Sequence, residues 1–277
     1  MATSHHHACS HSDNRHAVKS LTDFEIEKNT KLNDAYSLIV LRECGGQAVD
    51  WQNILPGQFV EVQVISDSMA LRRPISIHDI DSDNHTITLL VRVAGKQTAR
   101  LCDMPEGAIL NLMLPLGNGF NLTAAGESPL LVGGGVGVAP LLLLGKSLNV
   151  NGIRPTFLLA AKSVNDLLQI DAFKSVGNVL ISTDDGSAGV AGLVTENPAL
   201  DADVWTHIYC CGPMPMMKAV AAIALRKNIS CEVSLENSMA CGLGACLCCV
   251  EDTLDAGNVC VCTDGPVFDV KRLKWFN

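Results

Sequence analysis

Near its middle the chain reads Leu130-Leu131-Val132-Gly133-Gly134-Gly135-Val136-Gly137-Val138-Ala139-Pro140, an apolar run that leads into glycines. We interpret it as a buried strand, a glycine turn and the start of a helix. Glycine lets a dinucleotide approach the backbone, and the N-terminus of a helix stabilises negative charge. A proline follows where a last glycine or alanine often stands, so the pattern is not a regular Rossmann fingerprint. A glycine turn that serves packing alone is the alternative.

Downstream of residue 126, apolar runs alternate with helical patterns. This alternation is typical of a parallel sheet covered by helices, and it predicts an α/β domain over residues 126–228. The expected strands are 156–161, 179–182 and 206–210, and the expected helices are 139–148, 166–174 and 214–226.

A second strand-to-helix turn, Cys211-Gly212-Pro213, accompanies the first. Two such turns at the C-terminal ends of parallel strands should face one crevice, where ligands of open α/β sheets bind. Asp185 ends the strand between them and could reach a ribose or nicotinamide. An Asp-Gly pair that only forms a turn is about as good an interpretation.

Upstream, residues 21–125 carry short alternating strands separated by turn signals, which predict a small antiparallel β-barrel. Arg73-Pro74-Ile75-Ser76 begins one of these strands. An arginine there can bind a pyrophosphate, although a solvated arginine before a strand is more common. Gly95-Lys96-Gln97-Thr98 could begin a short helix that binds phosphate, or it could be an ordinary capped turn.

The C-terminal part, residues 229–277, is rich in cysteine: six of the chain's 12 cysteines lie between Cys241 and Cys262. Cys241, Cys246 and Cys249 have the C-x4-C-x2-C spacing of plant-type [2Fe-2S] proteins, in which four thiolates hold two irons. Small residues in this loop let the backbone turn tightly and point N–H groups at sulfur. Cys260 and Cys262 both suit the fourth place, and spacing does not choose between them. A zinc knuckle is the main alternative.

The bulk composition narrows the class of protein. The chain has 277 residues, a net charge of −9 and 4% aromatic residues, which argues against nucleic acid as a partner. The uncharged stretch 128–145 is broken by five glycines and two prolines, so we do not expect a membrane span. Residues 1–20 are polar and rich in histidine, and we expect a disordered tail. The cysteines are clustered and no secretory signal precedes them, which favours a location of the protein in the reducing cytoplasm.

Three motifs stand in a fixed order: Arg-Pro-Ile-Ser in a barrel, the two glycine turns, and a C-terminal cysteine loop. This order resembles the ferredoxin reductase superfamily. The C-terminal motifs indicate a smaller family within this superfamily. Residues 239–246 (Met-Ala-Cys-Gly-Leu-Gly-Ala-Cys) and 262–268 (Cys-Thr-Asp-Gly-Pro-Val-Phe) resemble the electron-transfer subunits of class 1B dihydroorotate dehydrogenases. The resemblance extends from about residue 22 to the end.

The resemblance implies three cofactors, FAD, a [2Fe-2S] cluster and NAD, each in its own part of the chain. It selects Cys262 as the fourth cluster ligand, after Cys241, Cys246 and Cys249. Gln97 and Ser238 depart from what relatives often carry at these places. The residues expected to bind FAD are Arg73, Pro74, Ile75, Ser76, Leu90, Val91, Arg92, Gln97 and Thr98, and those expected at NAD are Gly133, Gly134, Gly135, Gly137, Asp185, Cys211, Gly212 and Pro213.

The resemblance also implies a partner. An FMN-containing dihydroorotate dehydrogenase catalytic subunit would oxidise dihydroorotate in pyrimidine (UMP) biosynthesis, and its electrons would cross the cluster to FAD and then NAD⁺. A heterotetramer of two such chains and two catalytic subunits is expected. No acid–base pair for orotate chemistry stands out, so we expect no catalytic residue on this chain. The alternatives are a subunit of an NAD(P)H-dependent ferredoxin or sulfide oxidoreductase and, from another class, a zinc-stabilised interaction module.

Overall fold

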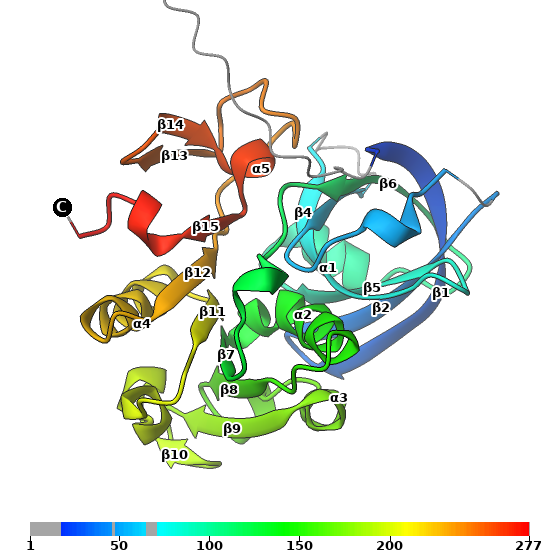
Figure 1. Ribbon diagram of the computed structural model, residues 1–277. Coiled ribbons are helices and arrows are strands. Elements are labelled where there is room, and N and C mark those ends of the chain that lie inside the picture. The colour runs from blue at the N-terminus through cyan, green and yellow to red at the C-terminus, as the bar shows by residue number, and fades with distance from the viewer. Residues whose placement is uncertain (1–17, 46–47, 65–70, 277) are drawn as a thin grey trace, which may run out of the picture.

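A computed structural model describes residues 18–45, 48–64 and 71–276 (Figure 1). Residues 1–17 of the expected histidine-rich tail lie outside this range. Across the described ranges, no helix has both the length and the apolar character needed to cross a membrane.

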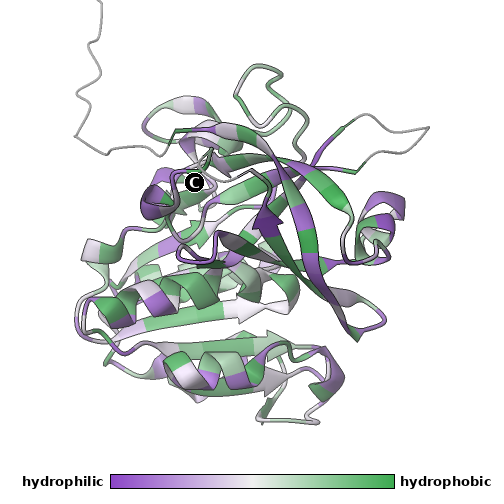
Figure 2. Ribbon diagram, turned by 90° about the vertical axis from the view of Figure 1, so that its right-hand side faces the viewer, coloured by the Kyte–Doolittle hydropathy of each residue, from purple (hydrophilic) through white to green (hydrophobic). Residues whose placement is uncertain are grey.

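The N-terminal part is a closed barrel of six strands, every pair of which is antiparallel. The strand order is β1-β2-β5-β4-β3-β6. Alternate side chains fill the interior, and in Figure 2 the strands change between hydrophobic and hydrophilic along their length. The barrel elements are β1 (Ser20–Asn33), β2 (Tyr36–Glu43), η1 (Trp51–Asn53), β3 (Phe59–Gln63), β4 (Arg73–Asp81), β5 (Thr86–Arg92), α1 (Lys96–Cys102) and β6 (Ile109–Leu116). The predicted barrel is therefore confirmed.

The second part is a seven-stranded sheet in the order β10-β9-β8-β7-β11-β12-β15, parallel except for its last strand. Its strands are β7 (Pro129–Gly134), β8 (Thr156–Ala161), β9 (Asn178–Thr183), β10 (Val190–Ala191), β11 (His207–Cys211), β12 (Ser230–Ser234) and β15 (Val267–Asp269), and its helices are α2 (Ala139–Val150), α3 (Ile170–Val176) and α4 (Met214–Arg226). Short 3-10 turns are η2 (Leu122–Ala124), η3 (Gly135–Val138), η4 (Val164–Asp166), η5 (Val194–Glu196), η6 (Pro198–Asp201) and η7 (Val270–Arg272). The predicted combination of barrel, parallel sheet and cysteine-rich end is confirmed.

Strand alternation divides the sheet into two apolar faces. One face packs against α4 and the other against α2 and α3, which lie toward the barrel in Figure 1. The helix expected at 166–174 begins only at Ile170, because Gln169 has a φ of 55° and a residue in the left-handed region cannot continue a helix from the preceding turn.

The cysteine-rich end is joined to the sheet. Strand β12 pairs in parallel with β11, and β15 pairs with β12, so the sheet continues past the boundary expected after residue 228. Between these two strands the chain forms the cysteine loop, the hairpin β13 (Val250–Thr253) and β14 (Gly257–Cys260), and the short helix α5 (Val261–Asp264). The division into domains at that position remains a proposal.

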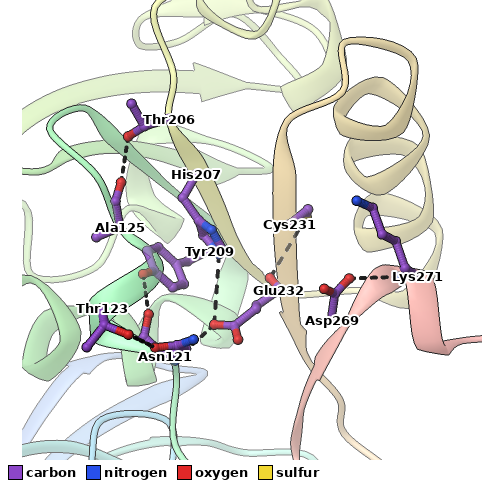
Figure 3. A network of polar contacts seen from close by, with 10 residues as sticks. All are labelled: Asn121, Thr123, Ala125, Thr206, His207, Tyr209, Cys231, Glu232, Asp269 and Lys271. Carbon is purple, nitrogen blue, oxygen red and sulfur yellow. Dashed lines mark hydrogen bonds and ion pairs between the residues drawn. The ribbon is translucent and has the colours of Figure 1, made fainter.

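The linker from barrel to sheet is held by a polar network (Figure 3). The Tyr209 hydroxyl donates to the Asn121 carbonyl at 2.7 Å, and the Asn121 N–H donates to the Glu232 carboxylate at 3.0 Å. His207 lies beside them, with its Nε2 3.9 Å from the same carboxylate. Burial lowers the pKa of His207 to about 4, so the ring is neutral at pH 7. Side chains of the sheet thus bind both the carbonyl and the N–H of Asn121, and these bonds fix how the barrel lies against the sheet.

Candidate functional site

A cavity of about 380 Å³ opens where the barrel, the sheet and the segment leading to the cysteines meet. No one of the three parts encloses it alone. Its lining residues are Phe59, Pro74, Ile75, Ser76, Leu90, Arg92, Ala94 and Thr98 from the barrel, Val136 and Ala139 from the glycine-rich turn, and Ser234, Leu235, Glu236, Asn237, Ser238, Met239 and Pro266 from the C-terminal part.

The barrel brings six of the predicted flavin-binding residues to this cavity: Pro74, Ile75, Ser76, Leu90, Arg92 and Thr98. Side chains alternate along β5, so Leu90 and Arg92 face the cavity whereas Val91 is buried in the barrel interior. Only the backbone of Val91 can therefore meet a ligand there. Arg73 and Gln97 are not among the lining residues, and the Arg73 guanidinium donates to the Gln97 side-chain oxygen.

Two glycine turns meet at the carboxyl ends of β7 and β11, as the sequence predicts. Their approach is so close that a Cβ on Gly137 would lie 2.4 Å from the Cys211 carbonyl oxygen. A Cβ on Gly134 would lie 2.5 Å from the Met216 sulfur. Gly135 differs, since it has a φ of +57° and a Cβ there would come only within 3.6 Å of the Tyr36 hydroxyl. Packing therefore explains Gly134 and Gly137, whereas a Cβ on Gly135 would make only an ordinary van der Waals contact.

Asp185 has a local partner. Its carboxylate accepts hydrogen bonds from the Ser187 hydroxyl at 2.6 Å and from the Ser187 N–H at 2.9 Å. These bonds, the hydroxyl first, hold the pKa of Asp185 below its usual value. This is the turn-forming arrangement considered as the alternative from sequence, and Asp185 does not line the cavity.

Sequence reasoning missed the third wall, residues 234–239. The segment follows β12, so it leaves the carboxyl end of a parallel strand, which is where ligands of such sheets bind. Burial raises the pKa of Glu236, and the positive charge of Arg92 partly offsets that shift. These two opposite charges come from the two sides of the cavity. The available signal was the position of this segment, which leads directly into the stretch 239–246 that resembles the electron-transfer subunits.

The cysteine loop presents N–H groups to sulfur. Gly244 N–H donates to the Cys262 sulfur at 3.2 Å, and Cys262 N–H donates to the Cys249 sulfur at 3.4 Å. Leu243 N–H donates to the Cys241 sulfur at 3.4 Å, and this bond is the largest cause of a Cys241 pKa of about 6. Donors aimed at sulfur are the arrangement that stabilises thiolate ligands of a cluster. The residues present therefore fit an iron–sulfur group.

The loop also has a tight backbone. Gly242 and Gly244 have φ values of +65° and +79°, and a Cβ on Gly242 would come within 3.0 Å of the Glu61 side chain. Within the described ranges, no three histidine, cysteine or carboxylate side chains are placed to hold a single metal ion. The cysteine spacing and the N–H groups directed at sulfur point instead to a two-iron cluster.

Glu61 supports the loop from the barrel side. Its side chain is completely buried in β3, and neither carboxylate oxygen has a hydrogen-bond partner. Burial raises the pKa of Glu61 to about 7, against the opposing effects of Arg72 and Arg73. An unpaired buried carboxyl is costly when it is charged, so its protonation state affects the stability of this contact.

Cavity and cysteine loop are adjacent. Met239 lines the cavity two residues before Cys241, and Pro266 lines it four residues after Cys262. A Cβ on Gly242 would also come within 3.1 Å of Leu116 and Met113 in the barrel strand β6. A redox group in the loop and a flavin in the cavity would therefore be neighbours.

Known proteins share both the sequence and the fold. Residues 236–274 match the family model of the iron–sulfur cluster binding domain of dihydroorotate dehydrogenase B. The electron transfer subunit of dihydroorotate dehydrogenase B (NAD(+)) from Shouchella clausii is 42% identical over 255 residues, which cover 88% of this chain and 95% of that protein. Its counterpart from Lysinibacillus sphaericus is also 42% identical, over 78% of this chain and 86% of its own length.

Among solved structures, that of an NADH-dependent reduced ferredoxin–NADP oxidoreductase matches with a TM-score of 0.80 and 29% identity. The match covers 91% of this chain and 90% of that one. The two structures therefore agree over nine-tenths of either chain.

Fold and site together define an iron–sulfur flavoprotein reductase of the ferredoxin reductase type. The chain belongs to the family of dihydroorotate dehydrogenase B (NAD(+)) electron transfer subunits. As a member it is an oxidoreductase subunit with FAD, a [2Fe-2S] cluster and NAD as cofactors, and it works with a catalytic partner subunit.

Proposed function

We propose that this chain accepts electrons from the FMN of a dihydroorotate-oxidising partner and delivers them to NAD⁺, in a heterotetramer of two chains of each kind. The observation that carries the proposal is the shared cavity, because it joins the barrel, the glycine-rich turn and the segment that leads into Cys241. We further propose that the assembly works in the cytoplasm, where thiols are kept reduced.

The bound groups supply one-electron transfer at the cluster and exchange between one- and two-electron chemistry at the flavin. The chain's own residues bind and orient them. We propose that Ser76, Leu90 and Arg92 contact the flavin from the barrel side, and that Glu236 balances the charge of Arg92 opposite them. Arg73, oriented by Gln97, is proposed to bind the FAD pyrophosphate. The remaining proposed FAD contacts are Pro74, Ile75, Val91 through its backbone, and Thr98.

For NAD⁺ we propose a site over the two glycine turns. Gly135 is less tightly packed than Gly134 and Gly137, and the neighbouring Val136 lines the cavity. The other proposed contacts, Gly133, Gly134, Gly137, Cys211, Gly212 and Pro213, would act through their backbone, since their side-chain positions are absent or filled. We also propose Asp185 as an NAD⁺ contact at the edge of the site. Its carboxylate would first have to give up its hydrogen bonds to Ser187.

For the cluster we propose Cys241, Cys246, Cys249 and Cys262 as ligands. Their role in the relay can be separated from that of the flavin by one variant. Cys241→Ala should keep its FAD and its NADH oxidation by an artificial acceptor, and lose at least 90% of dihydroorotate-dependent NAD⁺ reduction in the assembled enzyme. Cys248→Ala is the matched control, because Cys248 lies in the same loop, is exposed and is outside the proposed set. Equal losses of both activities in Cys241→Ala would contradict the proposed order of groups.

The choice of partner is tested by purification without oxygen and native mass measurement. Our proposal predicts an FMN protein at one copy per chain and a mass equal to two of each. The similarity to an NADH-dependent reduced ferredoxin–NADP oxidoreductase favours a second candidate, a subunit of a ferredoxin-linked oxidoreductase. Recovery of a large iron–sulfur subunit in place of the FMN protein would support that candidate against ours.

A further inference from the structure

The thiols around the cysteine loop fall into two groups. Cys241 and Cys246 lie at the two ends of one tight turn, in which the Leu243 N–H donates to the Cys241 sulfur at 3.4 Å. On the other side, the Cys249 sulfur accepts the Cys262 N–H at 3.4 Å, and Cys260 pairs across the β13–β14 hairpin with Val250, the residue after Cys249. A [2Fe-2S] cluster takes two thiolates on each of its irons. The first group therefore supplies two sulfurs for one iron, and the second supplies three sulfurs for the other.

Cys260 and Cys262 reach the same residue of the loop. The Cys262 sulfur accepts the Gly244 N–H at 3.2 Å, and the Cys260 thiol donates to the Gly244 carbonyl at 3.7 Å. Both side chains are buried, Cys262 completely and Cys260 to 9% exposure. Cys260 is thus an additional buried thiol beside the Gly244 residue that also contacts Cys262.

The two residues are also held by one short element. Cys260 ends β14, and Cys262 lies in the single turn of α5. The Cys260 N–H donates to the Asp264 carboxylate at 3.1 Å, which closes this turn. The two thiols are two residues apart in the chain, and both lie beside Gly244.

We propose that Cys260 is a reserve ligand of the iron held by Cys249, able to replace Cys262. The inference rests on the proposed [2Fe-2S] site. In the exchange, the Cys260 thiol releases its proton and its sulfur bonds to iron, while the bond between iron and the Cys262 sulfur breaks and that sulfur takes up a proton. No electron is gained or lost. The cluster has a spare thiol on one iron and none on the other.

Alanine variants of the full chain test this asymmetry, since a serine oxygen can itself bind iron. After purification without oxygen, Cys262→Ala should retain at least half of the wild-type iron and sulfide, with a shifted visible spectrum and shifted electron paramagnetic resonance of the reduced cluster. The double variant Cys260→Ala/Cys262→Ala should retain less than a tenth. Iron in Cys262→Ala as low as in the double variant would overturn the proposal.

Cys241→Ala separates this inference from the function itself. It should lose the cluster, because its iron has no reserve thiol of the same kind. A wild-type chain without iron, or a Cys241→Ala variant with a full cluster, would instead contradict the proposed ligand set. FAD content and far-ultraviolet circular dichroism report whether each variant is folded.

A second measurement keeps the native ligands in place and applies even when Cys262→Ala does not fold. Cys260→Ala should have a wild-type spectrum but lose its cluster to a chelator at least threefold faster, because the leaving Cys262 sulfur has no substitute. Cys248→Ala is the control and should lose iron at the wild-type rate. Equal rates for Cys260→Ala and wild type would count against a reserve role.

Discussion

The glycine-rich turn after β7 and the cysteine loop both contain several glycines, but these glycines meet different neighbours. In the turn after β7, Gly137 lies against the backbone of the turn after β11, so protein fills the place of its side chain. In the cysteine loop, Gly242 has a positive φ and lies against the ends of side chains from the barrel. The turn after β7 is part of the packed barrel and sheet, which together form the frame of the molecule. The cysteine loop lies against this frame.

Glycine is therefore needed in these two segments for two different reasons. A turn between two packed backbones needs glycine whether or not a cofactor is bound. A loop that points N–H groups at sulfur needs glycine for its φ angles, and its neighbours can move. Substitutions in the first turn should therefore act on the whole fold, and substitutions in the second mainly on iron content.

The largest expected effect is that of Gly137→Ala. The new Cβ would lie 2.4 Å from the Cys211 carbonyl oxygen and 2.5 Å from the Gly212 Cα, and neither backbone atom can move freely. We expect a loss of about 4 kcal/mol in the free energy of unfolding, at the upper end for overpacking. Urea unfolding measures it. Gly135→Ala is the control, with backbone strain of only about 1 kcal/mol. Equal effects of the two variants would show that the close packing against Cys211 and Gly212 is not the reason for glycine at 137.

Glu61→Gln should stabilise the contact beneath the cysteine loop above pH 7. The folded pKa of about 7 lies above the 4.5 of an unburied glutamate, so the native state favours the protonated carboxyl. The free-energy cost of keeping the charged Glu61 carboxylate buried is absent below pH 4.5. It grows as the pH rises to 7 and has its full value above that pH. Relative to wild type, the variant should gain up to about 3 kcal/mol at pH 8 and nothing at pH 4. Thermal unfolding over this pH range provides the measurement, and a gain independent of pH would refute the cause given.

Gly242→Ala should act on the loop more than on the frame. Its φ of +65° and the side-chain contacts at 3.0–3.1 Å together should cost about 1–2 kcal/mol locally. We expect a lower iron content with an unchanged melting temperature of the barrel and sheet. Gly257→Ala is the matched control, because its φ is +68° but no atom lies within 4 Å of the new Cβ. A fall in melting temperature as large as that of Gly137→Ala would show that the loop belongs to the frame.

The smallest effect is expected for Lys274→Ala. Its ammonium lies 2.8 Å from the Asp252 carboxylate, but both side chains are about half exposed, at 45% and 54%. Exposed pairs of this kind contribute less than about 1 kcal/mol. Neither iron content nor melting temperature should change measurably. A clear loss of iron would mean that the C-terminal segment helps to hold the cysteine loop.

The sequence by itself determined the order of the parts and their local character. Period-two strands predicted the barrel, the alternation after residue 126 predicted the parallel sheet, and 156–161 and 214–226 agree with β8 and α4 at both ends. Cysteine spacing indicated the first three cluster ligands. These features depend on neighbours along the chain, so local patterns carry them.

Only the tertiary structure decided which residues meet. It directs Leu90 and Arg92 to the cavity and Val91 into the barrel, because strand neighbours face opposite sides. It adds the wall 234–239, since β12 joins the sheet beside β11. It also brings Cys260 to Gly244, beside Cys262. These contacts join segments distant in sequence, and packing in three dimensions sets them.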